Sequence, residues 1–298
     1  MNNGQVMDEI GTRLPPMAGV VRVGLRHPVR WIIAALCVVV LAIVGRAFAY
    51  GQIEWAYVGR FLTAKAIVQG FGNTLLLTAL AMALGIILGL IAALMRLSEN
   101  PVAKAIAGGY IWFFRGTPIY LQLLLWFNLA LIFPSVGIPG LWEARMVDVM
   151  TPFWAALLGL GVCQGAYTAE VIRAGILSVD AGQVEAARAV GMRGPQVMRH
   201  IVLPQTLRII TPPISNEVIG MLKHTSIAAV ISYNEVMHTA SMIYFVNNRV
   251  IEMLIVCSIY YLAAVTILSI LQSLLEKRLG RSLNRSSRRV ASEEGAGA

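Results

Sequence analysis

Six long apolar runs constrain what this chain can fold into. They lie at about 31–50, 71–95, 107–133, 153–176, 206–232 and 250–275. A helix that crosses the roughly 30 Å hydrocarbon core of a bilayer needs about 20 mostly apolar residues, because each residue adds about 1.5 Å. The sequence lacks the alternation that is typical of membrane β-barrels. It therefore predicts an all-α, polytopic membrane protein with about six transmembrane helices.

The composition agrees with this interpretation. Hydrophobic residues make up 57% of the chain and charged residues only 13%, whereas soluble domains average about 25% charged residues. The net charge of +9 could indicate a nucleic-acid partner, but the aromatic residues lie in the apolar runs and are not interleaved with the basic residues as a base-stacking surface requires. We therefore expect membrane lipid, and not nucleic acid, to surround the protein.

The lysines and arginines predict the orientation in the membrane. If the N-terminus is cytoplasmic, eighteen of the 24 basic residues lie on the cytoplasmic side, five lie outside, and Lys223 falls within a span. Basic residues accumulate in cytoplasmic loops of membrane proteins. We therefore expect both termini to be cytoplasmic.

The first apolar run has two interpretations. Arg22, Arg26 and Arg30 precede a short apolar core, and Ala47-Phe48-Ala49 resembles a signal-peptide cleavage site. The long charged leader instead favours an uncleaved anchor. The remaining topology is the same in either case.

The sequence offers no catalytic or metal-binding motif. Cys37, Cys163 and Cys257 each lie in an apolar run without a CxxC neighbour, so we expect small buried hydrophobic residues. None of the four lysines follows a glycine, so the chain has no G-K-[ST] phosphate-binding loop. H-E-x-x-H and G-x-S-x-G are absent as well. We expect no cofactor and no metal, and the chain is not predicted to be an enzyme.

A hydrophilic stretch interrupts the apolar runs between Asp180 and Pro204. Asp180 is suited to cap the start of a helix, and Gly191 is suited to its end. Pro195 suits the start of a second helix, which Pro204 is expected to end. The pattern predicts two short helices outside the membrane, joined at a glycine. Their alanine-rich surface is slim enough to enter a groove on another protein, although an ordinary cytoplasmic loop remains the alternative.

The spacing in this stretch resembles the signature of ABC transporter permease subunits. That signature is E-A-A, a glycine four residues after the second alanine, and I-x-L-P after nine further residues. The chain matches it with Glu185, Ala186, Ala187, Gly191, Ile201, Leu203 and Pro204. The resemblance implies a cytoplasmic coupling helix that docks on an ATPase subunit.

Three further segments are similar to the polar amino acid uptake permeases, the histidine, glutamine and arginine group. They are residues 110–127, 165–176 and 203–231. The resemblance implies a permease subunit of a binding-protein-dependent ABC importer for a polar amino acid or a related compound, in a bacterial inner membrane. Its implied partners are cytoplasmic ABC ATPase subunits, a second permease (the same chain or a sister subunit) and an extracytoplasmic substrate-binding protein. The main alternative is a stand-alone ion-coupled transporter, which would have no coupling helix.

The resemblance also divides the chain. Residues 67–278 correspond to the five-span permease domain of the family, and residues 1–66 add an N-terminal tail and an extra span of unknown role. Residues 279–298 are expected to be a basic, disordered cytoplasmic tail.

Polar residues within the spans are candidates for a substrate path, because ionisable groups at membrane depth are costly and face a cavity or the bundle interior. Pro212 and Pro213 are expected to break their helix and so to expose backbone groups to this path. Two acids have open roles: Glu170 can neutralise Arg173 or contact substrate, and Glu217 can neutralise Lys223 or contact substrate. The candidates are Arg115, Thr117, Gln122, Gln164, Tyr167, Glu170, Asn216, Glu217, Lys223, His224, Thr225 and Ser226.

Overall fold

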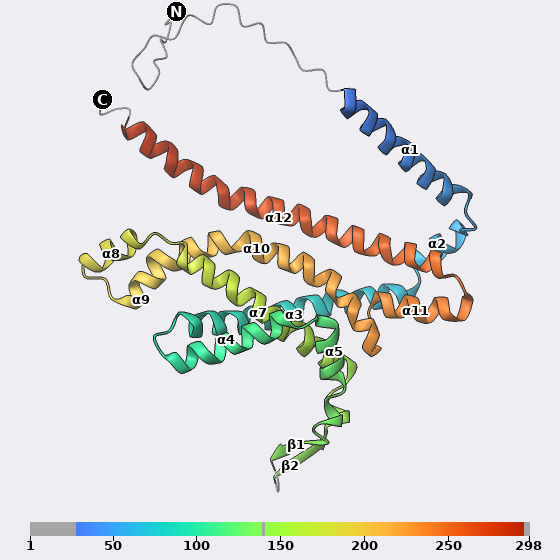
Figure 1. Ribbon diagram of the computed structural model, residues 1–298, viewed down its shortest axis with the longest axis horizontal. Coiled ribbons are helices and arrows are strands. Elements are labelled where there is room, and N and C mark those ends of the chain that lie inside the picture. Colours follow the sequence, from blue (N-terminus) through green and yellow to red (C-terminus); the bar gives the residue numbers. More distant parts are fainter. Residues whose placement is uncertain (1–27, 139–140, 295–298) are drawn as a thin grey trace, which may run out of the picture. The chain divides into compact units, whose positions relative to one another are not determined.

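The structure, a computed structural model, describes residues 28–138 and 141–294, with backbone only for 279–294. The chain divides into two units, Met1–Ile53 and Glu54–Ala298. In the first unit, α1 (Pro28–Tyr50) is a single helix of 23 residues (Figure 1). Its described side chains are all exposed and mostly apolar, and the helix is long enough to cross a membrane. This confirms a spanning helix for the run at 31–50.

The second unit is a helical bundle (Figure 1). Its elements are α2 (Trp55–Leu62), α3 (Lys65–Leu97), α4 (Pro101–Gly116), α5 (Ile119–Phe127), η1 (Leu129–Leu131), β1 (Ser135–Ile138), β2 (Trp142–Arg145), α6 (Met146–Val149), α7 (Pro152–Leu177), α8 (Ala181–Ala189), α9 (Gly194–Val197), η2 (Met198–Val202), α10 (Leu203–His224), η3 (Thr225–Ile231), α11 (Val236–Asn247) and α12 (Val250–Glu294). Three of these helices, α3, α7 and α12, are long and apolar enough to span a membrane. They confirm the runs at 71–95, 153–176 and 250–275.

The run at 107–133 is not the single helix that the sequence predicted. The chain forms α4, breaks at Thr117, and resumes as α5 and η1. Thr117 has an extended backbone (φ −110°, ψ 143°), as expected for a residue before proline, whose ring disfavours helical geometry at the preceding position. Pro118 therefore ends α4 and turns the chain into α5.

The run at 206–232 also differs from the prediction. Pro212 and Pro213 lie inside α10 without breaking it, and the helix changes to 3₁₀ geometry only at Thr225. Proline removes a helical hydrogen bond, but neighbouring hydroxyls can compensate in membrane helices. Here the Thr211 hydroxyl donates to the carbonyl of Leu207, and not to the carbonyls of Arg208 and Ile209 that Pro212 and Pro213 leave without a helical donor. The predicted helix break at the prolines is wrong.

Helices α3 and α7 approach each other closely through glycines. A Cβ atom built on Gly85 of α3 would lie 2.7 Å from Cγ of Gln164, and one on Gly165 of α7 would lie 2.8 Å from Cβ of Leu88. Only a residue without a side chain fits at such contacts, and small residues allow membrane helices to pack backbone to backbone. The pair forms the centre of the bundle, and its surroundings bury Leu77, Leu123 and Leu160.

Two segments depart from the all-α prediction or from its boundaries. A two-stranded antiparallel hairpin, β1–β2, pairs Ser135 with Arg145 and Ile138 with Trp142, which the sequence did not predict. The backbone of α12 is helical to Glu294, whereas the sequence predicted disorder over 279–298; that disorder stays a prediction, and 295–298 lie outside the described residues. Extending an existing helix costs no new nucleation, which accounts for the continuation.

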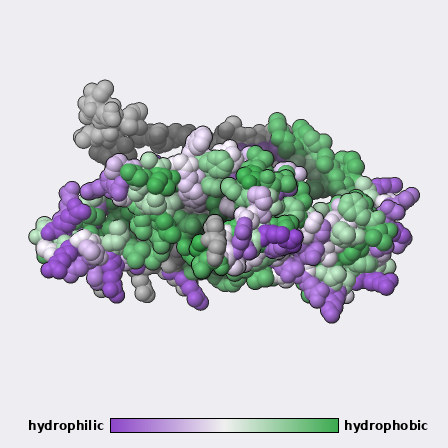
Figure 2. Space-filling view, turned by 90° about the horizontal axis from the view of Figure 1, so that it is seen from below, coloured by the Kyte–Doolittle hydropathy of each residue, from purple (hydrophilic) through white to green (hydrophobic). Residues whose placement is uncertain are grey.

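The surface follows the predicted membrane character. Figure 2 shows hydrophilic residues at both ends of the viewed face, the left end being where Figure 1 places α8 and α9, and mostly hydrophobic residues between the ends, interrupted by a hydrophilic group near the middle. Large apolar side chains of α3 are exposed, among them Leu76, Ile87 and Ile91. Lipid is the solvent that suits such a surface.

Candidate functional site

The hydrophilic stretch forms two short helices joined at a glycine, as predicted; we call residues 181–197 the α8–α9 hairpin. Asp180 caps α8 by accepting a hydrogen bond from the backbone N–H of Gln183 at 3.1 Å. Gly191 has φ +83°, in the left-handed region that favours glycine. The side chain of Gln205 on α10 donates to Gln183 at 2.7 Å. The hairpin is therefore held against the start of α10.

The structure separates the seven signature residues by role. Glu185, Ala186 and Gly191 are exposed on the hairpin, and Leu203 and Pro204 are exposed at the start of α10. Ala187 is instead buried with Val197 and Val202, and Ile201 packs beside them. Ala187 and Ile201 therefore pack in the core between the hairpin and η2, and the other five residues are exposed.

Pro204 does not end a helix, contrary to the prediction. The five residues before α10 form a turn of π-helix, Met198–Val202, and the chain continues through Pro204 into α10. A π turn shifts the backbone hydrogen bonds by one residue, which accommodates a proline that cannot donate one. The hairpin thus connects to α10 through continuous helical backbone.

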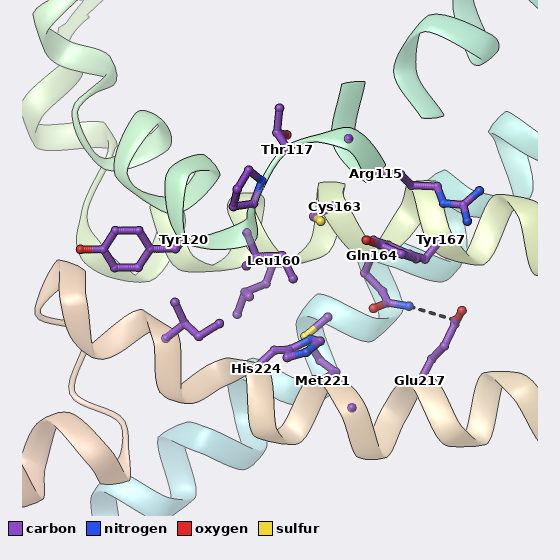
Figure 3. A pocket seen from close by; sticks show the side chains of 15 residues that line it. Arg115, Thr117, Tyr120, Leu160, Cys163, Gln164, Tyr167, Glu217, Met221 and His224 are labelled. Carbon is purple, nitrogen blue, oxygen red and sulfur yellow. Dashed lines mark hydrogen bonds between the residues drawn. The ribbon is translucent and has the colours of Figure 1, made fainter. Parts of the chain in front are cut away.

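A cavity of about 680 Å³ lies where α4, α5, α7, α10 and η3 meet. The break between α4 and α5 forms one wall, α7 a second, and α10 with Ile227 of η3 a third (Figure 3). Six of the twelve predicted path residues line it: Arg115, Thr117, Gln164, Tyr167, Glu217 and His224. Glu217 and His224 share one face of α10, as their seven-residue spacing predicted.

Glu217 is the acid that reaches this cavity. Its Oε2 accepts hydrogen bonds from Nε2 of Gln164 at 2.9 Å and from Oγ1 of Thr168 at 2.8 Å. Gln164 and Thr168 are 7% and 0% exposed, so the two donors hold the carboxylate from the buried side. Lys223 is exposed and takes part in no ion pair among the described residues. The Glu217–Lys223 pair, one of the two interpretations of this acid, is therefore not formed.

The cavity also holds a cation on another wall. The guanidinium of Arg115 lies over the ring of Tyr167, 5.3 Å from its centroid, and Figure 3 shows the two side chains next to each other. A cation over an aromatic face is attracted by the ring quadrupole. The site therefore presents an acid from α10 and a base from α4 to the same space.

Glu170 does not line the cavity. Its Oε2 accepts two hydrogen bonds from Arg173, at 2.7 Å from Nη2 and 3.1 Å from Nε. The structure therefore contains the ion pair that was one of the two interpretations of this acid.

Gln122 and Thr225 are buried away from the cavity. Nε2 of Gln122 donates to the carbonyl of Phe114 and to both oxygens of Thr117, so it holds the break between α4 and α5. The hydroxyl of Thr225 donates to the carbonyl of Leu222 at 2.7 Å. Both residues shape the walls and do not face the cavity.

Asn216, Lys223 and Ser226 lie elsewhere on the surface. Asn216 accepts a hydrogen bond from Gln272 of α12 at 3.0 Å. Ser226 donates to the carbonyl of Lys223 and lines a separate shallow groove with residues of α11 and α12.

Sequence reasoning missed several cavity residues. Cys163, Leu160 and Met221 line the cavity, but apolar side chains within apolar runs carry no signal that separates them from packing residues. Cys163 and Cys257 are buried as expected, whereas Cys37 is exposed on α1. Tyr120 lines the cavity because α5 restarts just before it, so recognising the Thr117–Pro118 break would have found it.

The fold and the site define a polytopic membrane protein with a cavity between its helices and a hydrophilic helical hairpin. Residues 85–281 match the family described as "Binding-protein-dependent transport system inner membrane component". The chain belongs to this family.

Three similar proteins support this. The arginine transport system permease protein ArgU of Corynebacterium glutamicum is 39% identical over 264 residues, covering 88% of this chain and 83% of ArgU. The L-cystine transport system permease protein TcyL of Bacillus subtilis is 37% identical over 214 residues, covering 71% and 86%. A crystal structure of an amino acid ABC transporter with histidines matches with TM-score 0.67 and 35% identity, covering 76% of this chain and 99% of that one.

These findings confirm the predicted class. The chain is an integral inner-membrane protein and a permease subunit of a binding-protein-dependent ABC importer, a class that works with ATPase and substrate-binding partners. Permease subunits of this kind are not themselves catalytic. The stand-alone ion-coupled transporter is not favoured.

Proposed function

We propose that the chain forms the translocation path for a polar amino acid that carries a positive charge. The observation that supports this is the carboxylate of Glu217, which reaches the cavity while two neutral donors, Gln164 and Thr168, hold it. A carboxylate without a cation partner is available to an ammonium or guanidinium group. Arg115, on another wall, is suited to a substrate carboxylate. The relative named as an arginine permease agrees with this chemistry.

The energy for transport comes from partner subunits. The α8–α9 hairpin carries the exposed Glu185, Ala186 and Gly191, and its continuous backbone into α10 suits it to receive a movement from a docked ATPase. ATP is bound and hydrolysed there and not by this chain. A second permease, identical or related, completes the path, and an extracytoplasmic binding protein delivers the substrate.

The proposed domain limits treat the chain as the family's five-span core with one additional N-terminal span. Residues 67–278 form the permease domain, residues 1–66 an N-terminal tail and anchor, and residues 279–298 a basic extension at the inner membrane surface. The N- and C-termini are cytoplasmic.

Uptake into proteoliposomes tests the substrate assignment. The complete complex, with ATPase and binding protein, is assayed with arginine and with an uncharged amino acid that the binding protein also delivers. Losing one charge-assisted contact costs about 1.5–3 kcal/mol, so Glu217→Gln is expected to lower arginine uptake by about tenfold or more and to spare the uncharged substrate. Glu170→Gln, which removes an acid outside the cavity, is the matched control. Arginine uptake that survives Glu217→Gln would show that another group selects the substrate.

Thiol labelling in intact cells tests the orientation. Single cysteines at Asn247 and at Gln196 are compared, using an impermeant reagent and a background without native cysteines. The Asn247 site is expected to react from outside and the Gln196 site only after permeabilisation. Reaction of the Gln196 site in intact cells would reverse the orientation and remove the hairpin from the ATPase.

A further inference from the structure

A second acid, Glu235, is buried outside the cavity. It lies in the link 232–235 between η3 and α11, beyond the predicted span at 206–232, and is 0% exposed. The ion pairs among the described residues do not include it. A buried charge without a cation is costly unless several hydrogen bonds compensate, so the surroundings of this carboxyl have to account for it.

Three donors from two helices converge on the carboxyl group. The backbone N–H of His238 donates to Oε1 at 2.6 Å, and that of Met237 donates to Oε2 at 2.8 Å. The hydroxyl of Tyr261, on α12, donates to Oε2 at 3.1 Å. An ionised carboxylate only accepts hydrogen bonds, so this arrangement suits an acid better than an amide, whose NH₂ would face a donor.

The link itself is held to α3. The N–H of Val236 donates to Oγ1 of Thr74 at 3.1 Å, and Nδ2 of Asn73 donates to the carbonyl of Asn234 at 2.8 Å. Glu235 therefore joins α11 and α12 at the point where α3 already holds the backbone.

In sequence, the link comes directly after η3, which together with α10 forms one wall of the cavity. His224 and Ile227 line the cavity, and η3 continues from them to Ile231, which is buried. Ser232 then turns the chain with φ +58°. A change at Glu235 is thus transmitted through one short 3₁₀ segment to His224 and Ile227, which line the cavity.

We propose that Glu235 is a positioning residue for transport, whose carboxylate holds the link between η3 and α11 and so sets the position of the wall formed by His224 and Ile227. The inference rests on the translocation role proposed for the cavity. It assigns Glu235 no contact with substrate.

Proton binding gives this role a distinctive signature. Burial raises the pKa of Glu235 to about 7, against the opposing effect of its hydrogen bonds to Met237, His238 and Tyr261. The titratable groups that face it are Tyr233 in the link and Cys257 and Tyr261 on α12, while α11 contributes backbone N–H groups and α3 neutral side chains. Protonation near neutral pH would weaken the charge-assisted bonds that hold the link.

Stability and transport then depend on pH in opposite directions. Because the pKa is raised from 4.5 in the folded protein, the folded state binds the proton more tightly, and stability increases as pH falls through about 7 toward 4.5. Transport is expected to fall over the same range. The contribution of Glu235 to stability therefore does not explain a loss of transport at lower pH.

The test is arginine uptake per folded complex in proteoliposomes between pH 6 and 8. Wild-type uptake is expected to fall as pH falls through about 7, and Glu235→Gln to transport about tenfold more slowly, with no titration near 7. Glu252→Gln is the matched control. Glu252 is also buried, at 4% exposed, but its carboxylate is bonded to the N–H of Glu54 and paired with Arg249, away from the cavity. This control is expected to keep the wild-type rate and pH profile.

A milder variant covers the case in which Glu235→Gln does not fold. Tyr261→Phe removes one donor to the carboxylate and is expected to raise the midpoint of the transport profile. A wild-type rate and profile in both variants, or the same change in Glu252→Gln, would overturn the inference and leave Glu235 as a helix cap. Sensitivity to Glu217→Gln in the same assay would then show that the proposed function stands without it.

Discussion

The cavity and the α8–α9 hairpin both place polar groups in a very apolar chain, but they satisfy them differently. In the cavity, Glu217 is bonded to Gln164 and Thr168, which are themselves buried. On the hairpin, Glu185 and Arg188 are exposed, and the described structure gives them no side-chain hydrogen bond. The cavity is therefore organised within the chain, and the hairpin presents a surface suited to a partner. The cavity should respond to changes in packing, and the hairpin to changes in backbone shape.

The largest effect is expected from adding a side-chain atom on α3 that pushes against Gln164, a residue lining the cavity. In Gly85→Ala, the new Cβ would lie 2.7 Å from Cγ of Gln164, and overpacking of this kind typically costs about 1–3 kcal/mol. Gln164 would have to move away from Glu217, so both thermal stability and arginine uptake should fall. Gly72→Ala on the same helix is the control, because no atom lies within 4 Å of its Cβ. Equal behaviour of the two variants would remove the link between α3 packing and the cavity.

The next effect concerns the hairpin turn. Gly191 has φ +83° and open space around it, so a substitution there meets strain and not collision. A β-branched residue in this conformation costs about 1–2 kcal/mol, so Gly191→Val should reduce ATP hydrolysis stimulated by loaded binding protein by roughly five- to thirtyfold.

Two controls separate strain from loss of surface. Asparagine tolerates the left-handed region, so Gly191→Asn should retain most of the stimulated hydrolysis. Gly194→Ala, also with open space but without a positive φ, should be close to wild type. A Gly191→Asn complex as inactive as Gly191→Val would point to the docking surface instead of the backbone.

The smallest effect is expected at the Glu170–Arg173 pair, which belongs to neither region. The two side chains are 24% and 32% exposed, and partly exposed pairs contribute about 0–1 kcal/mol. Glu170→Gln, Arg173→Gln and the double variant should therefore differ in free energy of unfolding by less than about 1 kcal/mol, with uptake per folded complex unchanged. Lost uptake in a stable Glu170→Gln protein would return this acid to the substrate path.

The sequence predicted helices better than their interruptions. Length and apolarity identified α3, α7 and α12, because a bilayer allows few alternatives to a continuous helix. The prolines were harder to interpret: Pro118 breaks the chain, whereas Pro212 and Pro213 do not. The difference depends on how the surrounding helices pack, which a single sequence does not display.

The candidate site was predicted in part for a similar reason. Residue type identified the polar groups of the spans, and helical spacing placed Glu217 and His224 on one face. The partner of each acid, Glu170 or Glu217, could be identified only from the distances between side-chain atoms in the structure. Glu170 takes Arg173 three residues away, whereas Glu217 takes Gln164 and Thr168, about fifty residues distant in sequence. Such long-range pairs have no local signal.

The close contact between α3 and α7 has a mechanical consequence. At Gly85 and Gly165 the side chains of Gln164 and Leu88 occupy the space that a Cβ would need, so sliding one helix along the other would drive these side chains into the opposing backbone. We therefore expect the two helices to move together, as one stiff beam, during the transport cycle. Deformation has to concentrate in the parts that meet this beam, the kink at Thr117 and the π turn that leads into α10. The cavity would then open by movement of those walls around a stationary Gln164 and Thr168.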